Sequence, residues 1–243
     1  MKNYMHIIKQ AIRSIIFMIL FYLWSIIIFI SILLLSWKKY EKIKNIPVIW
    51  SNVIMYLLRV IVGIKYRVNG IDNIPKNKPF IIVSAHQSAW DTWGLCAIIK
   101  QPIVFILKRE LMLIPLFNIC LKIYGCIPIK RGDKNMINNI ISTSKQELNK
   151  SKVIGIFPQG SRKKPEDKIK CKSGIWYLYQ YFKDIDFIPV SLDSGKFWAK
   201  GQLIKSDGLI TVTVHKKLNL SREINKHEFL DKLENILSDQ INY

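Results

Sequence analysis

Two long apolar runs occupy the first quarter of the chain. The first, residues 15–35, contains no charged residue and no proline. Because a membrane-crossing helix needs about 20 such residues, this run is long enough to cross a bilayer. It exceeds the apolar core of a typical signal peptide, and no small-residue cleavage site follows it. We therefore expect residues 15–35 to form a retained membrane anchor.

The second apolar run, residues 47–64, is shorter and carries Arg59. Two interpretations are open: an interfacial helix that packs beside the first run, so that the pair lies in one leaflet as a hairpin, or a buried core helix. Four lysines follow the first run and three cations precede it. The positive-inside rule therefore favours a cytoplasmic location for the flank that leads into the rest of the chain.

Beyond residue 65, short β-branched runs alternate with longer amphipathic ones. This rhythm predicts an α/β domain over residues 65–243, with a mixed, largely parallel sheet flanked by helices, after N-terminal membrane-associated helices over residues 1–64. Ligands of such sheets bind beyond the carboxyl ends of the strands. The expected strands are 65–69, 80–85, 102–107, 127–130, 153–157, 187–192 and 209–216. The expected helices are 89–100, 110–124, 134–150, 173–183 and 225–241.

The net charge of the chain indicates which classes of partner to expect. Lysine and arginine number 37 against 17 acidic residues, which gives a formal net charge of +20. Such an excess favours a polyanionic partner, although a solvated basic surface has the same composition. A nucleic-acid partner is not expected, because the cations are not interleaved with aromatic residues in a recognisable module and the anchor argues against it.

The cysteines do not indicate a metal or a disulfide framework. Four are present, none forms a C-x-x-C pair, and no histidine lies at ligand spacing from them. We expect free thiols in a reducing compartment.

One of the four histidines lies in the stretch VSAHQSAWDTW, residues 83–93. His86 follows a buried-strand pattern, and Ser88 to Asp91 spells S-x-x-D, a capping box for the next helix. The capping interpretation explains Asp91, but it does not explain His86, because a helix cap needs no imidazole at that position. Alternatively, Asp91 accepts a hydrogen bond from one ring nitrogen of His86 and leaves the other nitrogen as a base. Spacing alone leaves both interpretations open.

Two basic loops follow strand patterns further along the chain. Lys130 and Arg131 end a short strand before a helix start, which is typical of an anion site. In residues 153–166, VIGIFPQGSRKKPE, Gly160 permits a tight turn and the next cations can surround a phosphate. Each loop alone is equally consistent with solvated charges. A fourth block, residues 187–198, contains no reactive group, and we interpret it as a wall of the site or a substrate contact.

These four blocks, in this order, resemble the 1-acyl-glycerol-3-phosphate acyltransferases among the glycerolipid acyltransferases. The family motif N-H-x-S-x-x-D corresponds to residues 85–91, and the second motif to 125–131. The motif F-P-E-G-T-R corresponds to 157–162, and the apolar-Pro-Val run to 188–190. The resemblance covers roughly residues 60 to 220.

Three positions depart from the family pattern. Ala85 replaces asparagine, which removes some local hydrogen bonding, and Ser161 replaces threonine but keeps its hydroxyl. Gln159 replaces glutamate, so a carbonyl acceptor is kept and a charge is lost. If the glutamate contacts substrate hydroxyls, glutamine can serve; if its charge is required, the choice of acceptor changes.

The resemblance implies transfer of an acyl group from acyl-CoA or acyl-carrier protein to the sn-2 hydroxyl of lysophosphatidate, giving phosphatidic acid. His86 is then the base, and Asp91 fixes its tautomer. The other implied site residues divide into phosphate-binding residues, Arg131, Arg162 and Lys163, and residues that contact substrate or support the loops, Ser88, Gln159, Gly160 and Ser161.

The resemblance implies no cofactor and no metal; the acyl donor is a co-substrate. The expected partners are membrane lipid and the donor, at a bacterial inner membrane with the catalytic domain on the cytoplasmic face. The alternatives are an acyltransferase for another lysolipid or for glycerol 3-phosphate, and a non-catalytic protein that binds anionic lipid. The sequence leaves the oligomeric state, the chain-length preference and the mode of anchoring open.

Overall fold

The computed structural model describes residues 2–35, 37, 43–130 and 132–239. Its strands form one seven-stranded sheet in the order β1-β7-β6-β2-β5-β3-β4. All pairs are parallel except β6 with β7, so β1 and β7 run against the other five strands. The sheet is therefore mixed and largely parallel, as predicted. The strands are β1 Ile64–Asn69, β2 Phe80–Ser84, β3 Ile103–Lys108, β4 Ile127–Ile129, β5 Val153–Ile156, β6 Asp186–Leu192 and β7 Gly208–Val214.

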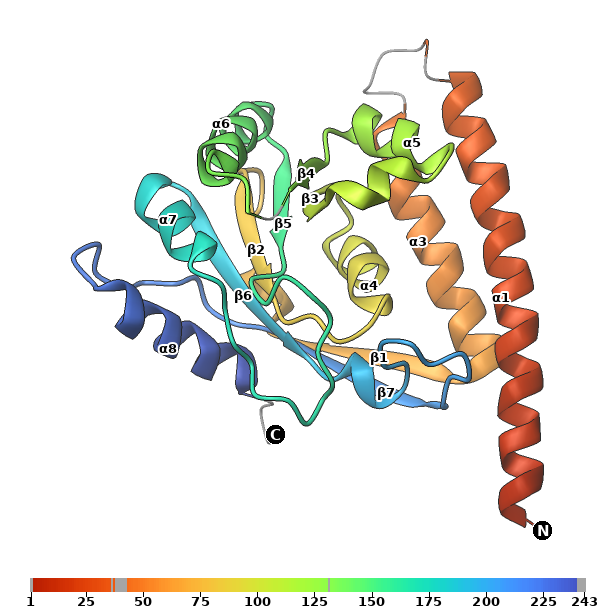
Figure 1. The fold of residues 1–243 in the computed structure, drawn as a ribbon. Coiled ribbons are helices and arrows are strands. Elements are labelled where there is room, and N and C mark those ends of the chain that lie inside the picture. Colours follow the sequence, from red (N-terminus) through yellow and green to blue (C-terminus); the bar gives the residue numbers. More distant parts are fainter. Residues whose placement is uncertain (1, 36, 38–42, 131, 240–243) are drawn as a thin grey trace.

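Helices cover both faces of the sheet (Figure 1). The described helices are α1 Lys2–Leu35, α3 Ile46–Leu57, α4 Trp90–Ile99, α5 Phe117–Tyr124, α6 Met136–Asn149, α7 Gly174–Tyr181 and α8 Lys226–Ser238. The central strand β2 reads FIIVS and is buried throughout, as expected for a strand covered on both faces. Its side chains alternate between two apolar clusters: Phe80 and Ile82 pack on the side of α1, α3 and α4, and Ile81 and Val83 on the side of α6, α7 and α8.

The expected helix over residues 110–124 is a wrong prediction in its first half. A 3-10 helix spans Arg109–Leu113, and α5 begins only at Phe117. Pro115 lacks the backbone N–H that a continuous helix needs, and it disfavours helical geometry at the residue before it. Leu116 then has a φ of 63°, which ends any helical path through this point.

The second apolar run forms α3, which continues as a π-helical turn over Leu58–Val62. One face of this run is buried, and α3 packs between α1 and α4 (Figure 1). It is therefore both a core helix and a neighbour of the first run. Apolar residues from α1 and α3 belong to the same hydrophobic cluster as residues of the sheet. The domain boundary at residue 64 stays a prediction.

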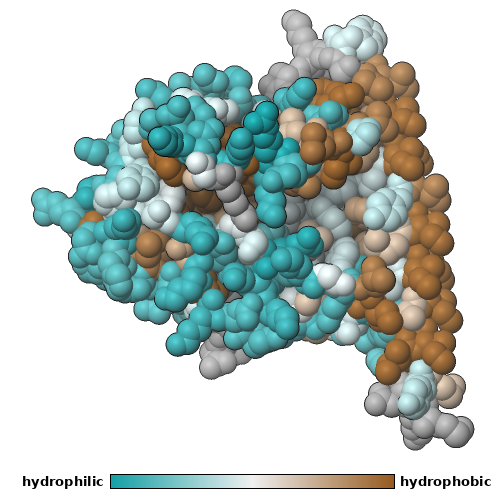
Figure 2. Space-filling view, viewed as in Figure 1, coloured by the Kyte–Doolittle hydropathy of each residue, from teal (hydrophilic) through white to brown (hydrophobic). Residues whose placement is uncertain are grey.

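Helix α1 is longer than the predicted anchor and is apolar enough, over Tyr4–Leu35, to cross a membrane by length and composition. Only a narrow face of it packs against the body. The buried residues on that face recur at spacings of three, four or eight positions, as one face of a helix requires: Gln10, Ser14, Phe17, Ser25, Ile28 and Ile32. Beyond Arg13 the exposed side chains of α1 are mainly apolar, and they form an apolar band along the helix (Figure 2).

The four cysteines are free thiols, as predicted. Burial raises the pKa of Cys96 to about 12, which keeps that thiol protonated. In the described part of the chain, no group of three histidine, cysteine or acidic side chains is placed to hold a metal ion.

The loop before β7 attaches to α1 through a buried lysine. The backbone N–H of Lys205 donates to Ser14 Oγ at 2.8 Å. Its side chain is only 1% exposed, and Nζ lies 4.4 Å from the centre of the Trp198 ring. Gln10 hydrogen-bonds Asp207 in the same loop. Burial lowers the pKa of Lys205 from its ordinary 10.5 to about 8.

This lowered pKa predicts a pH-dependent stability. Between pH values of about 8 and 10.5 the unfolded chain binds a proton at Lys205 that the folded chain has released. Stability should therefore rise with pH across that window. We expect the melting temperature of wild type minus that of Lys205→Met, in detergent, to increase over this range and to be flat below it. The subtraction removes other titrating groups, and a difference that is constant with pH would contradict the prediction.

Candidate active site

The order of the strands brings three of the four sequence blocks together. Strand β2 lies between β6 and β5, and the three run parallel, so the loops that follow them meet at one edge of the sheet. The second block ends on the edge strand β4, three strands away, or about 14 Å at ordinary strand spacing. Lys130 is exposed there, and Arg131 lies outside the described residues.

His86 and Asp91 form the hydrogen bond that their spacing suggested. Nδ1 of His86 lies 2.8 Å from Oδ2 of Asp91. Since a carboxylate only accepts, the neutral imidazole carries its proton on Nδ1 and leaves Nε2 unprotonated. Nε2 has no partner among the described residues, and the side chain is 17% exposed. The ring therefore has a buried, fixed edge and an outward edge with a free lone pair.

The Asp91 carboxylate is completely buried and accepts several hydrogen bonds. Besides His86, the backbone N–H groups of Gln87 and Ser88 donate to Oδ2 at 2.7 and 2.9 Å. Ser88 Oγ in turn accepts from the N–H of Trp90, the first residue of α4, at 3.1 Å and so satisfies one backbone donor at the start of the helix. The capping and orienting interpretations of Asp91 are thus both satisfied by one carboxylate. A buried charge needs such donors to offset its lost hydration.

The loop after β5 holds the backbone of His86 from two sides. Oε1 of Gln159 accepts from the N–H of His86 at 2.7 Å, and the N–H of Lys163 donates to the carbonyl of His86 at 2.8 Å. Gln159 is 3% exposed. Its role here is to support the loop, and a neutral amide oxygen is sufficient for that hydrogen bond.

A tight turn carries the cations of this loop. The N–H of Gly160 donates to the carbonyl of Phe157 at 2.9 Å, and Gly160 has a φ of 72°, a conformation that favours glycine. Ser161, Arg162 and Lys163 follow it and are half-buried. Within the described chain neither Arg162 nor Lys163 has an acidic side chain at ion-pair distance, so both cations are available to an anion.

Comparison with known proteins agrees with this architecture. The family model described as Acyltransferase matches residues 65–193. The chain belongs to the acyltransferase family. It is 29% identical over 210 residues to the 1-acyl-sn-glycerol-3-phosphate acyltransferase of Pseudomonas aeruginosa, covering 84% of this chain and 80% of that one. The enzyme of the same name from Borreliella burgdorferi is 30% identical over 186 residues, or 74% and 71% of the two chains.

A solved structure shows the same fold. The crystal structure of the 1-acyl-sn-glycerophosphate acyltransferase PlsC from Thermotoga maritima superposes with a TM-score of 0.75. The match covers 94% of this chain and 95% of that chain at 20% identity. The predicted α/β fold with its N-terminal helix is therefore the fold of a known acyltransferase.

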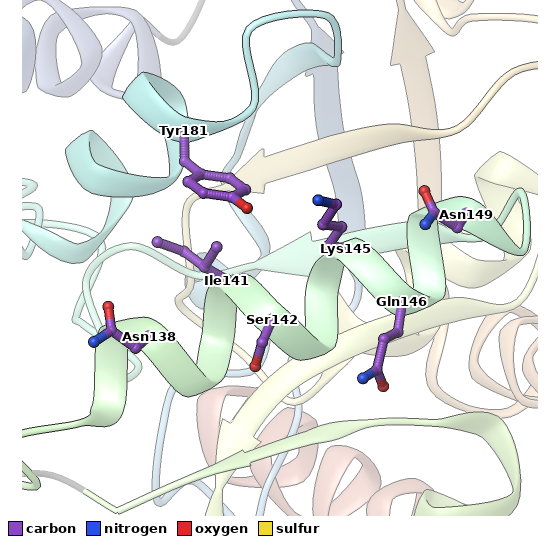
Figure 3. Close-up of a pocket in the computed structure, with 7 residues that line it drawn as sticks. All are labelled: Asn138, Ile141, Ser142, Lys145, Gln146, Asn149 and Tyr181. Carbon is purple, nitrogen blue, oxygen red and sulfur yellow. The ribbon is translucent and has the colours of Figure 1, made fainter.

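A separate hollow lies on another part of the acyltransferase. It measures about 570 Å³ and is lined mainly by polar side chains of α6, with Tyr181 from the end of α7 (Figure 3). None of the predicted site residues lines it. This hollow is therefore separate from the group of residues around His86 at the edge of the sheet.

The fourth block contributes a residue that the sequence analysis missed. Ser194 is fully buried, and its hydroxyl donates to Oδ1 of Asp91. The next residue, Gly195, donates its N–H to Oε1 of Gln87 at 3.1 Å. A small-residue turn after a buried strand was the only signal in the sequence, and it becomes meaningful once β6 is known to lie beside β2.

Ser194→Ala should slow catalysis while leaving the fold intact. The change removes a donor from the buried Asp91 carboxylate, and the loss of such a hydrogen bond should cost about 1–3 kcal/mol of the interaction that orients His86. We expect the turnover number to fall about tenfold or more, with Ser194→Thr keeping the hydroxyl and part of the activity. The measurement is steady-state acyl transfer beside a thermal melt. Turnover equal to wild type would show that this hydrogen bond does not contribute to the reaction.

Proposed function

We propose that this acyltransferase transfers a fatty acyl group from a thioester donor to the sn-2 hydroxyl of a 1-acyl-glycerol 3-phosphate, giving phosphatidic acid. The observation that carries the proposal is the outward-facing Nε2 of His86 on a loop held by the cation-bearing turn. The names of the matched relatives support the same acceptor.

His86 acts as the proton carrier in this reaction. Nε2 takes the hydroxyl proton as the oxygen attacks the thioester carbonyl, because an alcohol is a weak nucleophile until a base removes that proton. The carbon–sulfur bond then breaks, and the imidazolium returns the proton to the leaving thiolate. Asp91 holds the productive tautomer and stabilises the imidazolium between these two steps. No covalent intermediate on the protein is needed.

Arg162 and Lys163 hold the acceptor phosphate. The guanidinium of Arg162 presents a planar pair of donors that matches two phosphate oxygens, whereas Lys163 supplies a point charge. The assignments of Arg131 to the phosphate and of Ser161 to substrate contact stay predictions. The oxygen of Gln159 accepts from the His86 N–H, as a glutamate oxygen also could, so the replacement keeps this support of the loop.

The acyl donor is acyl-CoA or acyl-carrier protein. Both carry the acyl group as a thioester and both are polyanionic, so the net charge of +20 suits either. No cofactor enters the proposed reaction. The inner-membrane location with a cytoplasmic catalytic domain remains part of the proposal, since both donors are water-soluble and the acceptor is a lipid.

The acceptor proposal predicts a phosphate-specific defect. Arg162→Ala should raise the KM for lysophosphatidate about tenfold or more, because it removes charge-assisted hydrogen bonds of about 1.5–3 kcal/mol. The KM for a 1-monoacylglycerol, which lacks the phosphate, should not change. The assay follows labelled acyl transfer to both acceptors, with acyl-CoA and acyl-carrier protein as donors.

Two matched variants accompany that assay. Lys168→Ala removes an exposed cation from the same loop and should leave both KM values unchanged. His86→Ala should abolish transfer to every acceptor; because it also removes a donor from the buried Asp91, a thermal melt checks that the variant is still folded. An unchanged KM for lysophosphatidate in Arg162→Ala would remove this arginine from the phosphate site, and transfer retained by His86→Ala would refute the base.

We infer that α1 lies along the membrane surface and does not cross the bilayer. Its packing contacts with the body extend over at least Gln10 to Ile32, about 33 Å of helix at the usual rise. This length equals the thickness of the hydrocarbon core, about 30 Å. A perpendicular α1 would therefore draw the polar body into the hydrocarbon. An in-plane α1 instead places its apolar band in the lipid.

Labelling of single cysteines tests this orientation. Tyr4→Cys and Trp37→Cys place exposed thiols near the two ends of α1, and Lys232→Cys marks the body. Each is made in a background without the four native cysteines and treated with a membrane-impermeant thiol reagent in sealed vesicles. All three should react from the same side. Reaction of Tyr4→Cys and Trp37→Cys from opposite sides would establish a crossing helix.

A further inference from the structure

The imidazole of His86 lies flat against an aromatic ring that the mechanism above does not use. The ring centres of His86 and Phe157 are 3.9 Å apart and the planes differ by 17°. Phe157 stacks in turn on Phe105, with centres 5.6 Å apart and planes within 1°. The three rings form a column that runs from the sheet to the base.

The sequence makes room for this column. Gly155 and Phe157 are two residues apart at the end of β5 and so face the same side. A side chain on Gly155 would meet the ring of Phe105 at 2.6 Å, so glycine allows Phe105 to lie beneath Phe157. Pro158 and the turn closed by Gly160 then direct the chain away from the sheet.

The face of a phenyl ring carries negative electrostatic potential and attracts a cation that lies over it within about 6 Å. A neutral imidazole gains little from this attraction, whereas an imidazolium gains more. In the proposed reaction His86 is neutral before attack and positively charged immediately afterwards. Asp91 contacts the edge of the ring at Nδ1 and Phe157 contacts its face, so the two stabilise the same charge without competing for it.

We propose that Phe157 is a positioning residue that stabilises the imidazolium form of His86 through the face of its ring. The inference rests on the proposed role of His86 as the proton carrier. It assigns the aromatic residue of the third block to catalysis through His86, separately from the cations of the same block, which are assigned to the phosphate.

Progressive fluorination of the ring tests the proposal without changing its shape. Phenylalanine with one, two and three fluorine atoms is incorporated at position 157, which reduces the negative potential of the face stepwise. The turnover number should fall at each step, reaching about a two- to thirtyfold loss at three fluorines. The KM for lysophosphatidate should stay within twofold of wild type, roughly, because this ring does not contact the phosphate in the proposal.

A matched series at position 105 provides the control. Phe105 stacks on Phe157 but is not the ring against His86, so its fluorination changes the phenyl–phenyl stack and leaves the face under the imidazole in place. That series should show no stepwise loss of turnover. Thermal melts of all variants check that the fold is kept, and Phe157→Leu reports the loss of the ring as a whole.

The outcomes separate this inference from the proposed function. A flat fluorine series at position 157, with Phe157→Leu impaired, would overturn the inference and leave only packing of the imidazole. Equal slopes at positions 157 and 105 would overturn it as well. If wild type acylates some other acceptor and not lysophosphatidate, the proposed function fails, and the series is measured on that acceptor with the same expected slope. If His86→Ala stays active, the inference falls together with the base.

Discussion

The site depends on one buried carboxylate. Asp91 has no contact with water, so hydrogen-bond donors must replace the hydration that its carboxylate has lost. Those donors come from two loops: the imidazole and two amides after β2, and the hydroxyl of Ser194 after β6. The same hydrogen bonds that make burial of the charge tolerable also close the start of α4 and fix the imidazole. Local folding and orientation of the imidazole are therefore a single constraint.

That constraint can be met only because of the order of strands in the sheet. His86, Gln159 and Ser194 are far apart in the sequence, yet β5, β2 and β6 are neighbours and parallel. Parallel strands place the start of each following loop at the same edge, so the loop after β2 is held on one side by Gln159 and on the other by Ser194. The edge strand β4 has no such neighbours, and Lys130, which follows it, lies apart from this group.

The dependence of the site on strand order also explains which features the sequence could predict and which it could not. Patterns that act over a few residues were reliable: the β-branched runs marked all seven strands, and the spacing of His86 and Asp91 indicated a shared hydrogen bond. The prediction of a continuous helix over residues 110–124 was wrong because Pro115 interrupts the amphipathic pattern and cannot donate a helical hydrogen bond. The support from Ser194, and the attachment of Gln159 to the backbone of His86, depend on which strands become neighbours. A single sequence carries almost no signal for that order.

The membrane-facing helix and the site belong to the same packed unit. Phe21 of α1 lies against Trp93 of α4, with ring centres 4.8 Å apart, and Trp50 of α3 contacts both rings. Asp91 is in the first turn of that same α4. A shift of α1 would therefore disturb the helix that carries the carboxylate. Because close-packed interiors transmit such shifts, the height of His86 above the apolar band of α1 is fixed by the fold. An acceptor whose chain stays in the lipid and whose phosphate lies at the headgroup level would meet the imidazole of His86 at one defined depth.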